Sequence, residues 1–186
     1  EVFAGSGVDD DPIYSGDWYT VCIASNLGWD LYADMPEALM EAIVINEEYT
    51  GLEAELNTDD YSLYLYADLM DLEGESLTQE DLEQLSTLID EAMQELTDTY
   101  QVTNSTVVIN ELEWIAFAGY GLYEDAQFAE YLFLCPTPDG AGLMLVELTV
   151  TGEDAGFDAG DDVAVEILSS MFPEAGAEED GDAGTP

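Results

Sequence analysis

The chain contains no lysine, no arginine and no histidine, yet it carries 44 aspartate and glutamate residues among its 186 residues, for a formal net charge of −44 at pH 7. Histidine and lysine supply most general bases, and basic side chains bind most phosphates and oxyanions. Sites of the Ser-His-Asp or Cys-His kind, Schiff-base chemistry, histidine-based zinc sites and P-loops are therefore excluded. Only carboxylate chemistry remains, as paired acids or as hard cations on oxygen ligands.

The missing cations also restrict the partners. A phosphate backbone or an anionic membrane is repelled by this chain and finds no basic residue to neutralise it, so we expect neither nucleic acid binding nor contact of the domain with anionic membranes. No apolar run in the sequence approaches the roughly 20 residues that cross a bilayer. We expect a monomer whose partner is an unidentified protein or glycan.

Cysteine is also scarce, with two residues, Cys22 and Cys135, each inside an apolar stretch. Two interpretations stay open, buried free thiols and a disulfide between them. A disulfide would close a loop of more than 100 residues and contribute about 4 to 5 kcal/mol in the chain-entropy model. An exported protein would favour the disulfide.

Hydrophobic residues make up 47% of the sequence and aromatic residues 11%, which is enough for a core in spite of the charge. Residues 1–15 are small, acidic and interrupted by Pro12, and they are predicted to be a linker. Residues 173–186 (PEAGAEEDGDAGTP) have the composition of an acidic low-complexity tail. The sequence therefore predicts one domain over residues 16–172.

Alternating apolar and polar residues predict most of the extended segments. In the segment 61–70, Leu63, Leu65, Ala67 and Leu69 share one face with Tyr61, so that face is predicted to be core. The Pro136–Gly140 segment has turn chemistry and predicts a hairpin between its neighbours. The predicted strands are 17–24, 29–32, 49–57, 61–70, 106–119, 128–135 and 142–151.

From Thr78 the apolar period becomes helical, with one stripe formed by Leu82, Leu85, Ile89, Ala92 and Leu96. A Gly- and Asp-rich loop follows the last strand, and Asp161 or Asp162 is predicted to cap a second helix that ends at Phe172, before Pro173. The fold class predicted from this order is α+β, an antiparallel sheet with a long central helix and a C-terminal helix packed on it.

Several segments resemble the PsbP-like fold family, over roughly residues 17–172. These are GWDLYADMP, YSLYLYADLM, the helix LEQLSTLIDEAMQEL, the strand ELEWIAFAGY, the hairpin around TPDG and the closing EILSSMF. The family includes an extrinsic photosystem subunit, a yeast Ran-binding protein and many small exported bacterial lipoproteins, and the lipoprotein type fits best. The resemblance implies a binding or assembly role with no common reaction, and it assigns no functional residue.

Two groups of residues are candidate sites. In the segment 153–162, Asp154, Asp158 and Asp161 form a candidate Ca²⁺ ligand set, but the segment lacks the residue order of an EF-hand, so a solvated loop with weak Ca²⁺ affinity is the alternative. Tyr64, Tyr66 and Asp68 form a candidate ligand strip for a glycan or a peptide, and the alternative is a strip covered by a helix on the second face of the sheet.

The functional expectation is a non-enzymatic binding or envelope-associated domain without a cofactor. Because it lacks lysine and arginine, trypsin-like proteases have no site to cleave. This property suits an extracellular or cell-surface location on a bacterium, with a lipid anchor through a removed or truncated N-terminus as one arrangement. The alternatives are a DNA-mimic inhibitor of a basic protein and a carboxylate-based calcium-binding protein. An engineered origin of the cation-free sequence would also fit, beside a natural one.

Overall fold

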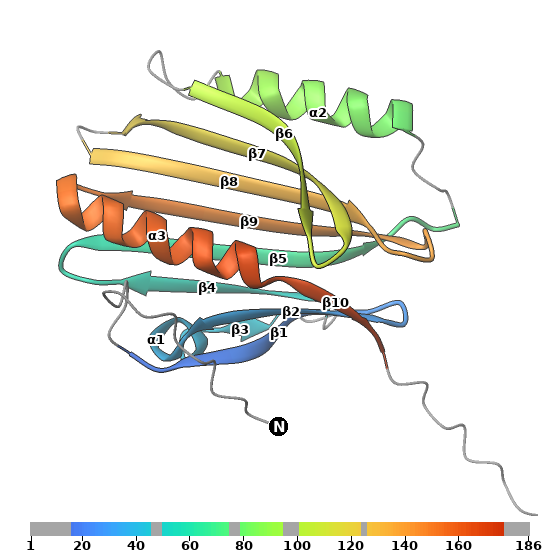
Figure 1. Cartoon of the computed structure of the whole chain (residues 1–186), viewed down its shortest axis with the longest axis horizontal. Helices are drawn as coiled ribbons and strands as arrows, with labels where there is room; N and C mark the ends of the chain where they lie inside the picture. Colours follow the sequence, from blue (N-terminus) through green and yellow to red (C-terminus); the bar gives the residue numbers. More distant parts are fainter. Residues whose placement is uncertain (1–15, 46–49, 75–78, 95–100, 124–125, 177–186) are drawn as a thin grey trace, which may run out of the picture.

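The computed structural model describes residues 16–45, 50–74, 79–94, 101–123 and 126–176 (Figure 1). The described residues form ten strands and three helices: β1 (Trp18–Asn26), β2 (Trp29–Pro36), α1 (Glu37–Met40), β3 (Val44–Ile45), β4 (Gly51–Asn57), β5 (Tyr61–Asp71), α2 (Gln79–Gln94), β6 (Gln101–Ile109), β7 (Leu112–Tyr123), β8 (Ala126–Pro136), β9 (Gly142–Gly152), α3 (Asp154–Ser170) and β10 (Phe172–Ala175). They build two antiparallel sheets, one in the order β1-β2-β10 and one in the order β3-β4-β5-β9-β8-β7-β6.

The predicted fold class, α+β with a long central helix, is wrong, because the described residues form a mostly β fold with two antiparallel sheets and include no long central helix. The helix predicted from Thr78 corresponds to α2, which contacts β6 and β7 at one end of the larger sheet (Figure 1). Within α2, Leu85 and Ile89 pack against a small apolar cluster around Phe117 and Phe128. The described side chains of the stripe, Leu85 and Ile89, therefore pack at this end of the sheet. Thr78, Leu96 and the side chains of Leu82 and Ala92 lie outside the described residues.

The predicted strands 49–57 and 61–70 correspond to β4 and β5, and the hairpin predicted around Pro136–Gly140 is confirmed as β8 and β9. β4 pairs with β5 and β8 pairs with β9, both antiparallel. On β5 the predicted core face is buried, and Leu63, Leu65 and Ala67 have no exposed surface at all. This face meets α3 and the smaller sheet, because α3 contacts β2, β5, β8 and β9, and β1 contacts β4 and β5.

The segment 106–119, predicted as one strand, contains the end of β6 and most of β7. The chain reverses at Asn110 and Glu111, which both have positive φ angles, of 48° and 71°. Two consecutive residues of this conformation are typical of the type I′ turn that joins tightly paired strands. The sequence Asn-Glu hid the turn, because glycine is the residue that usually marks its second position.

The segment 153–162 is helical and not a loop, because α3 begins at Asp154. Its two glycines are needed for close packing. A Cβ atom on Gly160 would lie 2.8 Å from both the ring of Tyr61 and a methyl group of Val150, and one on Gly156 would lie 2.5 Å from the carbonyl oxygen of Asp60. The glycines that suggested a loop thus let α3 approach the sheet.

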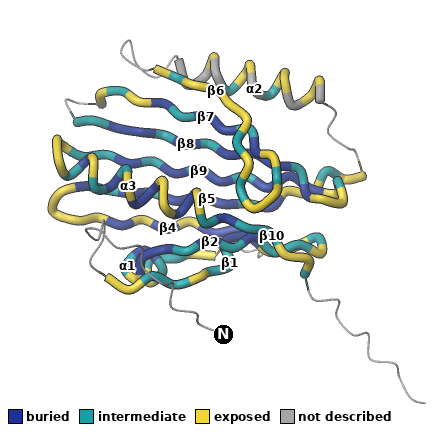
Figure 2. The backbone as a smooth tube through the Cα atoms, in the orientation of Figure 1, coloured by how far each residue is buried: buried dark blue, intermediate teal, exposed yellow. Residues whose placement is uncertain are grey.

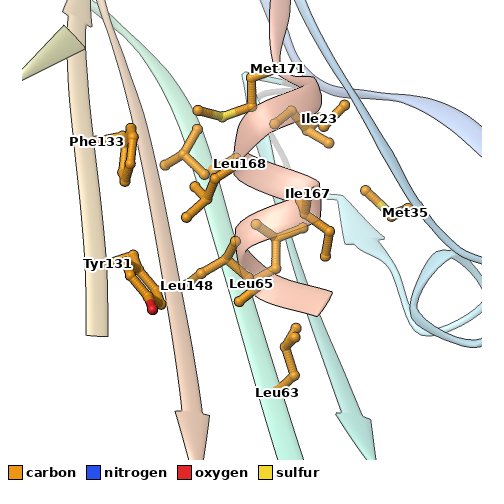
Figure 3. Packing of buried hydrophobic residues seen from close by; sticks show 14 of the residues in the cluster. Ile23, Met35, Leu63, Leu65, Tyr131, Phe133, Leu148, Ile167, Leu168 and Met171 are labelled. Carbon is orange, nitrogen blue, oxygen red and sulfur yellow. The ribbon is translucent and has the colours of Figure 1, made fainter. Parts of the chain in front are cut away.

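The core lies between α3, the larger sheet and the smaller sheet (Figure 2). Figure 3 shows Ile167 and Leu168 of α3, and Met171 directly after the end of α3, among side chains of β5, β8 and β9. Burying an aliphatic side chain of this size contributes about 1.5 to 3 kcal/mol. No helix among the described residues is long and apolar enough to span a membrane.

The C-terminal helix ends at Ser170, two residues before the predicted end. The chain then continues as β10, which pairs antiparallel with β2, and Phe172 stacks on Tyr32 with ring centroids 5.3 Å apart. The first residues of the predicted tail, Pro173–Ala175, therefore belong to a strand. The rest of the tail from residue 177 and the predicted linker 1–15 lie outside the described residues.

Candidate binding groove

An open groove of about 390 Å³ lies between α3, β8 and the end of β6. Its lining residues are Val107, Val108, Ile109, Asn110, Tyr131, Phe133, Val165, Leu168 and Ser169. The β6–β7 turn forms one wall and is held against the end of α3, because the Asn110 side-chain amide donates a hydrogen bond of 2.6 Å to the Met171 carbonyl. The groove is thus bounded by two elements that are linked to each other.

The groove lining is mainly apolar, and part of it is open to solvent. Val108 is 66% exposed and Val165 is 45% exposed, while Leu168 and Phe133 beneath them are buried. In Figure 3, Phe133 and Tyr131 of β8 face Leu168 of α3. A concave apolar surface with few polar groups is the usual form of a ligand site.

Three polar side chains are linked next to the groove. Tyr131 is 5% exposed, and its hydroxyl donates to Asp161 Oδ1 over 2.5 Å. The hydroxyl oxygen of Tyr120 lies 2.5 Å from that of Tyr131, and the two rings meet edge to face with centroids 5.9 Å apart. Because the Tyr131 proton is used by Asp161, Tyr120 is the donor to Tyr131. Asp161 lies one helical turn before Val165, on the same side of α3.

Burial and neighbouring side chains shift the pKa values of Tyr131 and Asp161. Burial, followed by the hydrogen bonds to Asp161 and Tyr120, raises the pKa of Tyr131 far above its ordinary value. Burial also raises the pKa of Asp161, and the neighbouring Asp162 and Asp158 raise it further, while the hydrogen bond from Tyr131 lowers it. Tyr131 therefore remains a neutral hydrogen-bonding group, which suits ligand binding and not proton abstraction.

The predicted strip of Tyr64, Tyr66 and Asp68 lies on β5, on the face opposite α3. All three side chains are half-buried. The Tyr66 hydroxyl donates to Asp68 over 3.1 Å and the Tyr64 hydroxyl donates to Glu53 over 3.3 Å. The helix on this face, α2, contacts β6 and β7. The three residues thus lie together on one strand, as predicted, and ligand binding by them stays a prediction.

The same face carries further carboxylates next to the strip. Glu147 of β9 stands opposite Tyr66 in the strand register, and Glu130 lies on the adjacent strand β8. Burial raises the pKa of Glu147, and the charge of Glu130 raises it further. The charges of these acids give this face a negative potential that repels anions.

A second cavity, of about 460 Å³, lies where the β1–β2 turn meets the end of β5. Its carboxylates are engaged by the chain itself, because Asp68 accepts hydrogen bonds from the Leu69 backbone N–H and the Tyr66 hydroxyl, and Asp71 accepts one from the Glu73 backbone N–H. We therefore consider the groove beside α3 the stronger candidate for a binding site.

The predicted Ca²⁺ ligands Asp154, Asp158 and Asp161 all lie on α3 and not in a loop. Within the described part of the chain, no three or more acidic or cysteine side chains gather in a way that could hold a metal ion. Asp161 instead accepts the hydrogen bond from Tyr131. A helix spreads these carboxylates along its length, whereas a Ca²⁺ loop folds them around one point.

The structure holds both Cys22 and Cys135 as free thiols, and a disulfide between them stays a prediction. The sulfur of Cys22 donates to the Ala24 carbonyl over 3.5 Å, while that of Cys135 lies 3.3 Å from the Glu113 carbonyl. Burial raises the pKa of Cys135 to about 12. The interpretation of buried thiols fits Cys135, and Cys22 is half-buried.

Sequence reasoning did not identify the groove or its polar group. Tyr131 stands in the apolar strand FAEYLFLC, where a tyrosine among buried neighbours is the only signal that a hydroxyl needs a partner. The sequence predicts Asp161 or Asp162 as a helix cap and Asp161 as a Ca²⁺ ligand, but the helix begins at Asp154, and no sequence signal indicates that Asp161 contacts a strand 30 residues earlier in the chain.

No family model and no curated protein matches this chain. The solved structures that resemble it include the following two. LpqN of Mycobacterium tuberculosis, described as involved in cell envelope biogenesis, has a TM-score of 0.47 and 10% identity, covering 86% of each chain. The Ran-binding protein Mog1p of Saccharomyces cerevisiae has a TM-score of 0.39 and 9% identity, covering 76% of this chain and 89% of its own. Similarity at TM-scores below 0.5 carries no argument about function, and the PsbP-like resemblance stays a prediction.

Proposed function

We propose that this protein is a non-enzymatic binding domain that holds the apolar part of a neutral or cationic ligand in the groove between α3 and the β6–β7 turn. The observation that carries the proposal is the apolar lining of the groove together with the linked hydroxyls of Tyr131 and Tyr120 and the carboxylate of Asp161. Such a site binds an apolar body by burial and orients a polar group by hydrogen bonds.

The charge of the protein selects the ligand. A net charge of −44 with no basic residue produces a negative potential around the whole molecule. An anionic ligand such as a fatty acid would also meet Asp161 beside the groove. A neutral or positively charged ligand meets no such opposition, and a cation would be attracted to the faces of the two tyrosine rings.

A role in binding and not in catalysis is supported by the residue types. Histidine and lysine, the usual general bases, are missing from the chain. The hydroxyl of Tyr131, next to the groove, has a raised pKa, so it stays protonated at neutral pH and does not supply a phenolate as base or nucleophile. The proposal includes no cofactor.

We further propose that the protein acts outside or at the surface of a bacterial cell. The support is the absence of lysine and arginine, which removes every trypsin cleavage site from both the folded and the unfolded chain. Trypsin should leave the heat-denatured chain intact while pepsin degrades it, and tryptic fragments would contradict this part of the proposal.

Two fluorescent probes with the same aromatic skeleton test the ligand class. N-phenyl-1-naphthylamine is neutral, and 8-anilinonaphthalene-1-sulfonate adds one negative charge. Because electrostatic effects on association reach about 10 to 10³-fold, the neutral probe should bind at least about tenfold more tightly at low salt. Equal binding of both probes would contradict the argument from charge.

A substitution in the groove tests whether the probe binds there. Val165→Trp places a large ring over the lining from an exposed position and should weaken binding of the neutral probe by about tenfold, or about 1.4 kcal/mol. Ala155→Trp is the matched control, because Ala155 is also exposed on α3 but does not line the groove. Equal binding by both variants would refute the groove as the site.

A further inference from the structure

The strand β6 forms one edge of the larger sheet and differs from the other edges that the structure describes. Natural edge strands avoid unwanted pairing by being short or by carrying a bulge, a proline or a charge. β3 has two residues, β10 contains Pro173 and Glu174, and β1 has a break in register between Cys22 and Ala24. β6 has nine residues (QVTNSTVVI) with no charge and no proline, paired with β7 in an unbroken register.

The C-terminal half of β6 is the accessible part of this edge. Ser105, Thr106 and Val108 are exposed. In Figure 1 the first half of β6 runs beside α2, and the second half turns away from α2 toward α3. The last residues of β6, Val107–Ile109, also line the groove. A regular strand edge and an apolar groove therefore meet in one place.

An edge beside a groove fits an extended peptide. In this mode of recognition the added strand gains affinity through main-chain hydrogen bonds, and alternate side chains enter pockets that give specificity. A strand added to β6 would place every second side chain on the face that holds Val107 and Ile109, toward Val165 and Leu168 of α3.

Charge decides which chain can occupy the edge. Two copies of this protein each carry −44 and repel one another, so the net charge takes over the protective role that charged side chains have on other edges. The same charge attracts a chain rich in lysine or arginine. The occupant favoured by charge complementarity is therefore a different protein with a basic, extended segment.

We infer that β6 accepts an extended segment of a partner protein, with alternating apolar residues and flanking basic residues, as an added strand whose apolar side chains enter the groove. This inference rests on the proposed function of the groove and names the class of its ligand. One partner segment would thus pair with the uncharged edge of β6 and fill the apolar groove at the same time.

The probe is the peptide KVTVTVTVK with blocked ends, and its binding is measured by calorimetry and by hydrogen exchange of the protein amides. We expect binding that protects amides in Ser105–Ile109 and displaces N-phenyl-1-naphthylamine. Replacing both lysines by glutamate should weaken binding at least about tenfold. Val165→Trp should weaken peptide binding, and Ala155→Trp should not.

Backbone methylation separates strand addition from simple charge attraction. Only one alternate set of peptide N–H groups can face β6, so N-methylation of the valines and N-methylation of the threonines should differ, with one abolishing binding and the other leaving it within about threefold. Equal effects of the two methylations, or amide protection elsewhere than β6, would overturn the inference. Concentration-dependent dimerisation of the protein through protected β6 amides would overturn it as well.

Failure of the inference is distinguishable from failure of the proposed function. If the neutral probe binds in the groove and the peptide does not bind, the groove is a ligand site and strand addition is refuted. If neither binds, both proposals are refuted.

Discussion

Replacing Tyr131 by phenylalanine removes one oxygen atom and tests the polar group next to the groove. The ring is buried in the core, so its packing is retained in the variant. The lost hydroxyl is the donor to Asp161 and the acceptor for Tyr120. The substitution therefore affects two hydrogen bonds and leaves the apolar contacts in place.

The expected cost follows from the kind of hydrogen bond that is lost. A hydrogen bond to a charged group contributes about 1.5 to 3 kcal/mol, against about 0.5 to 1.5 kcal/mol for a neutral pair. Tyr120 is 41% exposed, so its hydroxyl can turn to water. We expect Tyr131→Phe to lower the free energy of unfolding by about 2 kcal/mol at pH 7, which corresponds to about 4 to 8 °C in Tm for a domain of this size.

The cost should depend on pH through Asp161. Its pKa in the folded protein is already raised by burial, and the hydrogen bond from Tyr131 is the interaction that lowers it. Without Tyr131 the folded-state pKa rises further above the unfolded value, so the variant is penalised where Asp161 is ionised in both states and is relieved as pH falls through the folded-state pKa. The destabilisation should be largest near pH 7 and smaller near pH 4.

Urea denaturation at pH 7 and pH 4 measures both quantities. Tyr64→Phe is the matched control, because the hydroxyl of the half-buried Tyr64 makes one long, solvent-exposed hydrogen bond, of 3.3 Å, to Glu53. Loss of this bond should change stability by less than about 0.5 kcal/mol. If Tyr131→Phe costs no more than Tyr64→Phe, or if its cost grows as pH falls, the linked group does not exist as described.

Three further predictions concern the charge of the domain, its two cysteines and the packing of α3. The 44 carboxylates repel one another, so Tm should rise with NaCl, which screens this repulsion. Because the pKa values of Glu147 and Asp161 are raised, the folded state binds more protons than the unfolded state, and Tm should also rise as pH falls from 7 toward 5. Calorimetry that shows a Tm indifferent to salt would contradict the argument from repulsion. Without reductant, both cysteines should react with a thiol reagent in urea. In the folded protein, the half-buried Cys22 should react before the buried Cys135. If no thiol reacts in urea, the two cysteines are joined in a disulfide. Gly160→Val should destabilise the protein by at least about 2 kcal/mol, because its side chain overlaps Tyr61 and Val150, and an unchanged urea midpoint would show that α3 does not pack this closely.

Strand pairing was the part of the fold that local pattern could predict. Alternation in β5 identified its buried face, and Pro136–Gly140 identified the β8–β9 hairpin, because both signals lie within a few residues of the structure they specify. The turn at Asn110 and Glu111 was missed because its conformation carries no glycine. The start of α3 was missed because its glycines serve contacts with Tyr61 and Asp60, distant in sequence.

The position of the helices and the groove depended on long-range packing. The apolar periodicity of α2 predicts a helix but not the position of that helix at the end of the sheet. Its position depends on the apolar cluster around Phe117 and Phe128, against which α2 packs. The contact between Tyr131 and Asp161 joins a strand to a helix that begins 23 residues later, and no local pattern encodes it. The candidate strip was predictable because Tyr64, Tyr66 and Asp68 follow one another on the same side of a single strand.

The most direct test of the central claim is a map of amide chemical shifts during a titration with N-phenyl-1-naphthylamine. If the groove beside α3 is the ligand site, the largest changes fall on its lining and saturate at one probe per protein. The lining residues are Val107–Asn110, Tyr131, Phe133, Val165, Leu168 and Ser169. Changes centred on Tyr64, Tyr66 and Asp68, or changes spread over the surface without saturation, would contradict the claim that the groove binds the ligand.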